Sequence, residues 1–164
     1  MRSRMTALVL ATCLASGWAA AQGPVAHGFS VGLLPLSATG HVIYAGALGS
    51  GPGAPDLRVH GGVAGLPLFG SWLVWGTAGA DLLLPLTAGA ADAPVRPYAG
   101  VGAAAWLGNP ADAFFALSAS GLLGVAVALP AFELFVEARG SVAYAFDGGF
   151  LPWPTVAVGV NVAR

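Results

Sequence analysis

The sequence predicts an all-β protein, an eight-stranded antiparallel up-and-down transmembrane β-barrel that follows an N-terminal signal peptide. Three observations predict this fold class. Branched apolar residues alternate with small or polar ones, most strictly in 155–162, where valine occupies every second position. On a strand, a period of two sends the two kinds of side chain to opposite faces. The chain also begins with an export signal, and it is 57% hydrophobic but only 8% charged.

Residues 1–21 have the three-part layout of a secretory signal peptide. A short basic start is followed by a mostly apolar, uncharged segment (6–18) and by three alanines (19–21) that precede Gln22. We expect cleavage after the third alanine, which leaves one β-barrel domain over 22–164. The alternative is an uncleaved N-terminal membrane helix, but the apolar segment is short for a membrane span.

The composition of the mature chain excludes several classes of function. Removing the signal leaves four Arg, seven acidic residues, no Lys and no Cys, which is a formal charge of −3. Without cysteine there are no disulfides and no thiolate chemistry. Four scattered Arg form no basic patch, so we expect no nucleic-acid partner. Soluble domains carry about 25% charged residues, so a chain this poor in charge is better suited to a bilayer.

A helical polytopic membrane protein is the main alternative fold. The uncharged stretches 61–80 and 113–132 are each long enough to form a membrane helix. Glycine counts against helices, because 25 glycines are spread along the chain and each costs about 1 kcal/mol relative to alanine in a helix. The clusters of Lys and Arg that orient membrane helices are also missing after the signal.

Four strands are predicted in the first half of the mature chain. They are 25–34, 41–48, 57–64 and 72–84. In the first, third and fourth, large apolar residues alternate with glycine or polar residues, whereas the alternation of the second is weak. The Gly- and Pro-rich segment 49–56 predicts a loop, and 66–71 predicts a turn.

Four more strands are predicted in the second half. They are 96–107, 114–129, 132–146 and 155–162. The segments 85–95 and 108–112 are rich in Gly, Pro, Asn or Asp and predict connections, and a tight connection is expected at 130–131. A turn and the Pro-Trp-Pro segment 152–154 are expected to precede the last strand. Eight strands of about ten residues with short connections suit this chain length, whereas a sixteen-stranded porin would not fit.

Two segments resemble strands of a known class of barrel. Residues 96–102 read Arg-Pro-Tyr-Ala-Gly-Val-Gly, similar to the Pro-Tyr-x-Gly-x-Gly strand of small outer-membrane barrels of the outer-membrane protein A-like and X-like class. Residues 134–141 resemble a later strand of that class with inward Glu and Arg. The resemblance implies insertion into a bacterial outer membrane by the barrel-assembly machinery. Such barrels usually end in an aromatic residue that this machinery reads, whereas this chain ends in Arg164.

A polar network is expected inside the barrel. Its members lie on the small or polar faces of their strands and are Arg58, His60, Asp81, Glu137 and Arg139. Side chains just fill an eight-stranded barrel, and buried charges should be paired. We therefore expect a salt-bridge network that plugs the lumen. The alternative is a narrow gated ion path or a small binding site.

Other candidate sites have weaker support. His27, His41 and His60 lack metal-ligand spacing, so we expect no metal site and no cofactor. Some small outer-membrane barrels modify lipids with a Ser/His pair, and Ser141 with His60 is the alternative catalytic pair here, although no motif links them. Aromatic residues near strand ends predict interfacial girdles. They are Trp72, Tyr98, Trp106, Tyr144, Phe146, Phe150 and Trp153.

Together these patterns predict a structural outer-membrane β-barrel protein that is not an enzyme. We expect an envelope-stabilising role or a minor role in small-solute passage. Its expected partners are membrane lipid and the barrel-assembly machinery, and we expect a monomer. The alternatives are the helical membrane protein and the lipid-modifying barrel enzyme.

Overall fold

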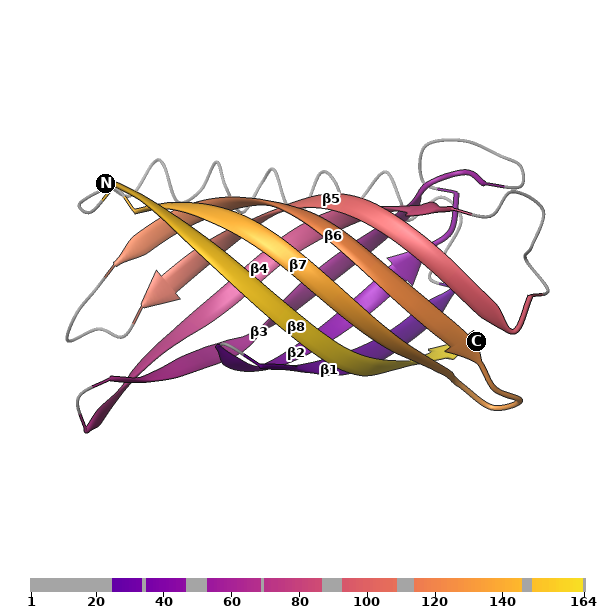
Figure 1. Ribbon diagram of the computed structural model, residues 1–164, viewed down its shortest axis with the longest axis horizontal. Helices are drawn as coiled ribbons and strands as arrows, with labels where there is room; N and C mark the ends of the chain where they lie inside the picture. Colours follow the sequence, from indigo (N-terminus) through magenta and orange to yellow (C-terminus); the bar gives the residue numbers. More distant parts are fainter. Residues whose placement is uncertain are drawn as a thin grey trace.

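A computed structural model of the chain describes residues 25–33, 35–46, 53–68, 70–86, 93–108, 114–145 and 149–163. They form a closed barrel in which each strand is hydrogen-bonded to the strands before and after it, and β1 pairs with β8. All eight pairings are antiparallel. Figure 1 shows the strands wound obliquely around the barrel. The predicted signal peptide, 1–21, lies outside the described residues.

The eight strands follow the predicted order. They are β1 (Ala26–Leu33), β2 (Leu36–Tyr44), β3 (Asp56–Leu68), β4 (Ser71–Pro85), β5 (Val95–Gly108), β6 (Phe115–Ala128), β7 (Glu133–Ala145) and β8 (Gly149–Ala163). The barrel therefore has two ends. At the hairpin end lie the connections after β1, β3, β5 and β7, and at the terminal end β1 begins and β8 finishes.

The predicted start of the second strand was wrong. β2 begins at Leu36 rather than at residue 41, and its first five residues pair with Gly61–Gly65 of β3. After Leu36, the outward positions of this part of β2 hold the small residues Ala38 and Gly40, so the alternation of large and small side chains is hard to recognise there. Pairing with β3, rather than the pattern of side chains, extends β2 back to Leu36. β2 ends at Tyr44, and the turn that follows includes Gly46 at a φ of 58°.

Prolines misled the prediction at two other boundaries. The segment 66–71 is mostly strand, since Leu68 pairs with Ser71 across a tight hairpin. Pro152 and Pro154 lie within β8, paired with Val142 and Gly140 of β7. Proline has no N–H and is tolerated in a strand where one side lacks a partner. β1 reaches along β8 only to Val156, so the two β8 prolines sit where no strand of the described residues pairs with their other side.

The alternative of two helices was also wrong. The described residues of 61–80 lie in or between β3 and β4, and most of 113–132 lies in β6. No helix in the described part of the chain is long and apolar enough to cross a membrane.

Inside and outside faces follow the predicted alternation. Every strand exposes at least one large hydrophobic side chain, among them Phe29, Leu36, Val63, Trp72, Val101, Leu123, Val136 and Val158. The buried set instead mixes alanines, two aromatic residues and three large aliphatic ones with His41, Arg58, Asp81, Ser118, Glu137, Ser141 and Asn161. The polarity of an ordinary soluble domain is thus inverted, with apolar side chains outside and ionised ones inside.

Candidate functional site

Four ionised side chains meet in the middle of the lumen, and we call them the quartet. They are Arg58 of β3, Asp81 of β4, and Glu137 and Arg139 of β7. Asp81 is 1% exposed, Glu137 4% and Arg58 5%. The structure thereby brings four of the five predicted network residues into direct contact. Arg58 and Asp81 are partners on the neighbouring strands β3 and β4, whereas Glu137 and Arg139 reach them from β7, which neighbours neither.

Each carboxylate of the quartet contacts both guanidinium groups. Arg58 donates from Nε to Asp81 Oδ2 at 2.9 Å and from Nη2 to Glu137 Oε2 at 2.8 Å. Arg139 donates to both oxygens of Asp81, and its Nη2 lies 3.1 Å from Glu137 Oε1. Two positive and two negative charges cancel, and such closely paired geometry is what offsets the cost of burying ions.

Three further side chains surround the quartet. Nε2 of His60 lies 3.5 Å from Asp81 Oδ2, so the fifth predicted residue borders the network without a hydrogen bond to it. Tyr98 donates to Glu137 Oε2 at 3.2 Å, and Ser120 contacts Arg139 Nη1 at 3.3 Å. Sequence reasoning left Tyr98 and Ser120 out of the network, although both occupy inward positions of their strands.

Glycine gives the quartet the space it needs. Gly102 lies directly opposite Asp81 across the β4–β5 pairing. A Cβ at this position would collide with Asp81 Oδ1, and one at Gly124 would collide with the Tyr98 ring. Absence of a side chain at these inward positions therefore lets longer side chains reach across the lumen.

A second polar chain lies toward the terminal end. His41 and Asn161 are joined by a 2.6 Å hydrogen bond between Nε2 and Oδ1, and Asn161 donates to Glu133 Oε1 at 2.7 Å. Glu133 also forms an ion pair with Arg96. The sequence did not predict this chain of contacts, because its members come from β2, β5, β7 and β8.

Aromatic side chains close around the lumen toward the hairpin end. Trp75 stacks on Trp106 with ring centroids 5.8 Å apart, and Trp153 lies edge-on to both. Phe114 adds an edge contact to Trp75. The girdle prediction was therefore wrong for Trp106, Trp153 and Tyr98, which point inward. Trp72, Tyr144 and Phe150 do face outward, and Phe146 lies outside the described residues.

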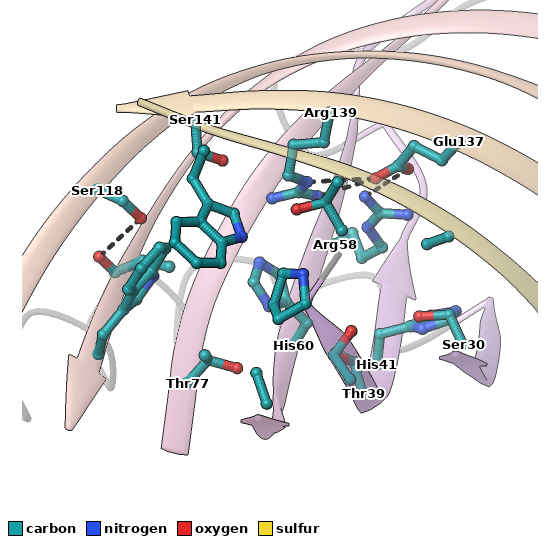
Figure 2. A pocket seen from close by; sticks show the side chains of 18 of the residues that line it. Ser30, Thr39, His41, Arg58, His60, Thr77, Ser118, Glu137, Arg139 and Ser141 are labelled. Carbon is teal, nitrogen blue, oxygen red and sulfur yellow. Dashed lines mark hydrogen bonds and ion pairs between the residues drawn. The ribbon is translucent and has the colours of Figure 1, made fainter. Parts of the chain in front are cut away.

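Two lumenal cavities lie on either side of the quartet. The Trp-side cavity, of about 120 Å³, is bordered by Trp75, Trp106 and Trp153. Figure 2 shows it from close by, with the quartet residues Arg58, Glu137 and Arg139 labelled. The terminal-side cavity, of about 110 Å³, is bordered by Tyr98, Arg96 and Glu133. Arg58 borders both. The quartet therefore interrupts the lumen between them.

The histidines are distributed differently from what their spacing suggested. His41 and His60 face each other across the β2–β3 pairing and both border the Trp-side cavity, whereas His27 faces outward. Within the described ranges, no group of three or more His, Cys, Asp or Glu could hold a metal ion. Ser141 borders the same cavity as His60. No hydrogen bond between the two is found in the described structure, and both side chains point away from the outer surface.

No family model matches the chain, and no curated protein or solved structure matches it. The resemblance to the outer-membrane protein A-like and X-like class stays a prediction. What the structure itself establishes is an eight-stranded, closed, antiparallel up-and-down barrel.

Proposed function

We propose that this chain is a structural outer-membrane β-barrel protein that stabilises the bacterial cell envelope. The observation that carries the proposal is the placement of charge. All seven charged residues in the described structure are buried or border a lumenal cavity. They are Asp56, Arg58, Asp81, Arg96, Glu133, Glu137 and Arg139.

The outer face supports a lipid environment. Large apolar side chains are exposed on every strand, up to 77% for Phe150 and 63% for Leu123. A soluble monomer rarely exposes contiguous apolar patches of more than a few hundred Å². A bilayer removes the cost of this surface, and closure of the barrel pairs the backbone groups that lipid could not satisfy.

The interrupted lumen supports a mainly structural role. The quartet separates the two cavities, and three indoles narrow the hairpin end. Passage of solutes through this state is therefore minor and limited to small species. We assign the chain to the outer-membrane protein A-like and X-like class on the strength of its two resembling segments and its strand number.

Export and partners complete the proposal. A signal peptide over 1–21 is removed, the barrel-assembly machinery inserts the chain, and the mature barrel acts as a monomer whose main partner is membrane lipid. Nucleic acid is not a partner, because inward-facing charges cannot present a basic patch.

Expression of the full chain in a Gram-negative host tests this proposal. We expect the processed protein in the outer-membrane fraction, faster migration in unboiled than in boiled gel samples, and sheet-dominated circular dichroism in detergent. The matched control starts at residue 22 and should stay in the cytoplasm. Recovery of the full chain in the soluble or inner-membrane fraction, or a helical spectrum, would contradict the proposal.

A further inference from the structure

Two buried nitrogen atoms beside the Trp-side cavity lack a hydrogen-bond partner in the described part of the chain. They are Nε1 of Trp153 and Nε2 of His60, and both residues border this cavity. Buried polar atoms in proteins are nearly always hydrogen-bonded, to protein or to a bound molecule. His60 Nε2 lies 3.5 Å from Asp81 Oδ2, too far for a good hydrogen bond, so both nitrogen atoms favour an occupant of the cavity that can hydrogen-bond.

Besides the quartet residues Arg58, Glu137 and Arg139, the wall presents two main kinds of surface, hydroxyl and aromatic. Hydroxyl groups, each able to donate and to accept, come from Ser30, Ser37, Thr39, Thr77, Ser141 and Thr155. Figure 2 shows four of these, Ser30, Thr39, Thr77 and Ser141, around the cavity with His60 among them. The indoles of Trp75 and Trp106 add flat apolar surface. Such a wall suits a molecule with hydroxyl groups on one edge and C–H groups on another.

Charge balance favours a neutral occupant. The two arginines of the quartet are matched by two carboxylates, and Arg139 already donates from Nε, Nη1 and Nη2 to quartet oxygens. An ion entering the cavity would bring a charge without a partner, and burying an unpaired charge is costly.

The size of the cavity limits the occupant further. A protein cavity of about 150 Å³ holds benzene, which has about six non-hydrogen atoms. The Trp-side cavity, at about 120 Å³, therefore suits a three-carbon polyol. A monosaccharide, with about twice as many atoms, would extend beyond this space on the same scale.

We propose that the Trp-side cavity binds a small neutral polyol of the size of glycerol. Its hydroxyl groups meet His60 and Trp153, and its C–H groups lie against Trp75 and Trp106. This inference goes beyond the proposed function and rests on the closed barrel rather than on its location. A barrel that folds in detergent but is not found in an outer membrane would contradict the proposed function without contradicting polyol binding.

The test is a glycerol titration of the ¹⁵N-labelled mature barrel in detergent, followed through its indole N–H resonances. We expect the Trp153 resonance to shift saturably, with half-saturation on the order of 1–10 mM for so small a ligand. The resonance of Trp72, on the outer face, is the internal control and should not shift. 1-Propanol, which keeps the three carbons but has one hydroxyl, should bind more weakly.

Two matched variants locate the contact. Trp153→Phe keeps an aromatic side chain but replaces the indole, with its N–H, by a smaller phenyl ring. It should weaken glycerol binding at least about five-fold, the effect of losing one hydrogen bond, as followed on Trp75. Trp72→Phe should leave binding unchanged. Absence of a saturable shift, an equal shift at Trp72, unchanged affinity of Trp153→Phe, or saturation by chloride instead of glycerol would each overturn the proposal.

Discussion

Arg139 donates two hydrogen bonds side by side to Asp81, from Nη1 to Oδ1 at 2.9 Å and from Nη2 to Oδ2 at 2.8 Å. The two residues come from β7 and β4, which are not neighbours in the barrel. Their contact therefore crosses the lumen. A two-fold contact of this kind fixes both distance and orientation, so the pair ties opposite walls of the barrel together.

Removing one charge of the quartet should destabilise the barrel strongly. Asp81→Asn leaves two buried arginines with one carboxylate, and an uncompensated buried charge costs about 3–5 kcal/mol. Reversible urea unfolding in lipid vesicles measures this. Asp56→Asn, near the terminal end, is the control and should cost about 1 kcal/mol or less.

A compensating double variant separates charge from shape. Asp81→Leu with Arg139→Met removes one charge of each sign and leaves Arg58 paired with Glu137. It should be clearly more stable than Asp81→Asn, because well-packed apolar residues can replace a buried ion pair. An equal loss of unfolding free energy in both variants would show that the stability of the quartet does not depend on its net charge.

Inward and outward glycines should respond oppositely to alanine. A Cβ at Gly102 would collide with Asp81, so Gly102→Ala should cost about 1–3 kcal/mol through overpacking. Gly121 is exposed with no atom within 4 Å of an added Cβ, so Gly121→Ala should be neutral or slightly stabilising. Similar losses at both positions would contradict the assigned faces.

Removing a quartet side chain that separates the two cavities should raise the conductance of the barrel. Arg58 is the quartet residue that borders both cavities, so Arg58→Ser should join them and increase single-channel conductance in a planar bilayer several-fold. Arg96→Ser, which changes only the terminal-side cavity, is the matched control. A folded Arg58→Ser barrel with unchanged conductance would place the closure elsewhere, for example at the indoles.

The alternation of residues with a period of two predicted most of the fold. It placed the valines of β8 outside and the polar faces of β3, β4 and β7 inside. The same alternation could also have placed Trp106 and Trp153 inside, since Trp106 shares the parity of Gly102 and Trp153 that of Thr155. Their nearness to strand ends suggested a girdle instead.

Contacts across the lumen could not be predicted in the same way. Arg58 and Glu137 are 79 positions apart, and their meeting depends on the stagger summed over several strand pairs. The boundaries of β2 and β8 were missed for a related reason. Local signals, namely the small outward residues Ala38 and Gly40 in β2 and the prolines in β8, were overridden by pairing with a neighbouring strand, β3 and β7 respectively.

The central claim, a lipid-facing exterior around a polar lumen, is tested most directly by cysteine scanning of 155–162. The mature chain has no cysteine, so each position can carry a single nitroxide label on the barrel in lipid vesicles. Collision with oxygen, which dissolves in lipid, should be high at Val156, Val158, Val160 and Val162 and low at the alternate positions. A flat profile, or one that repeats every three to four residues, would contradict the account.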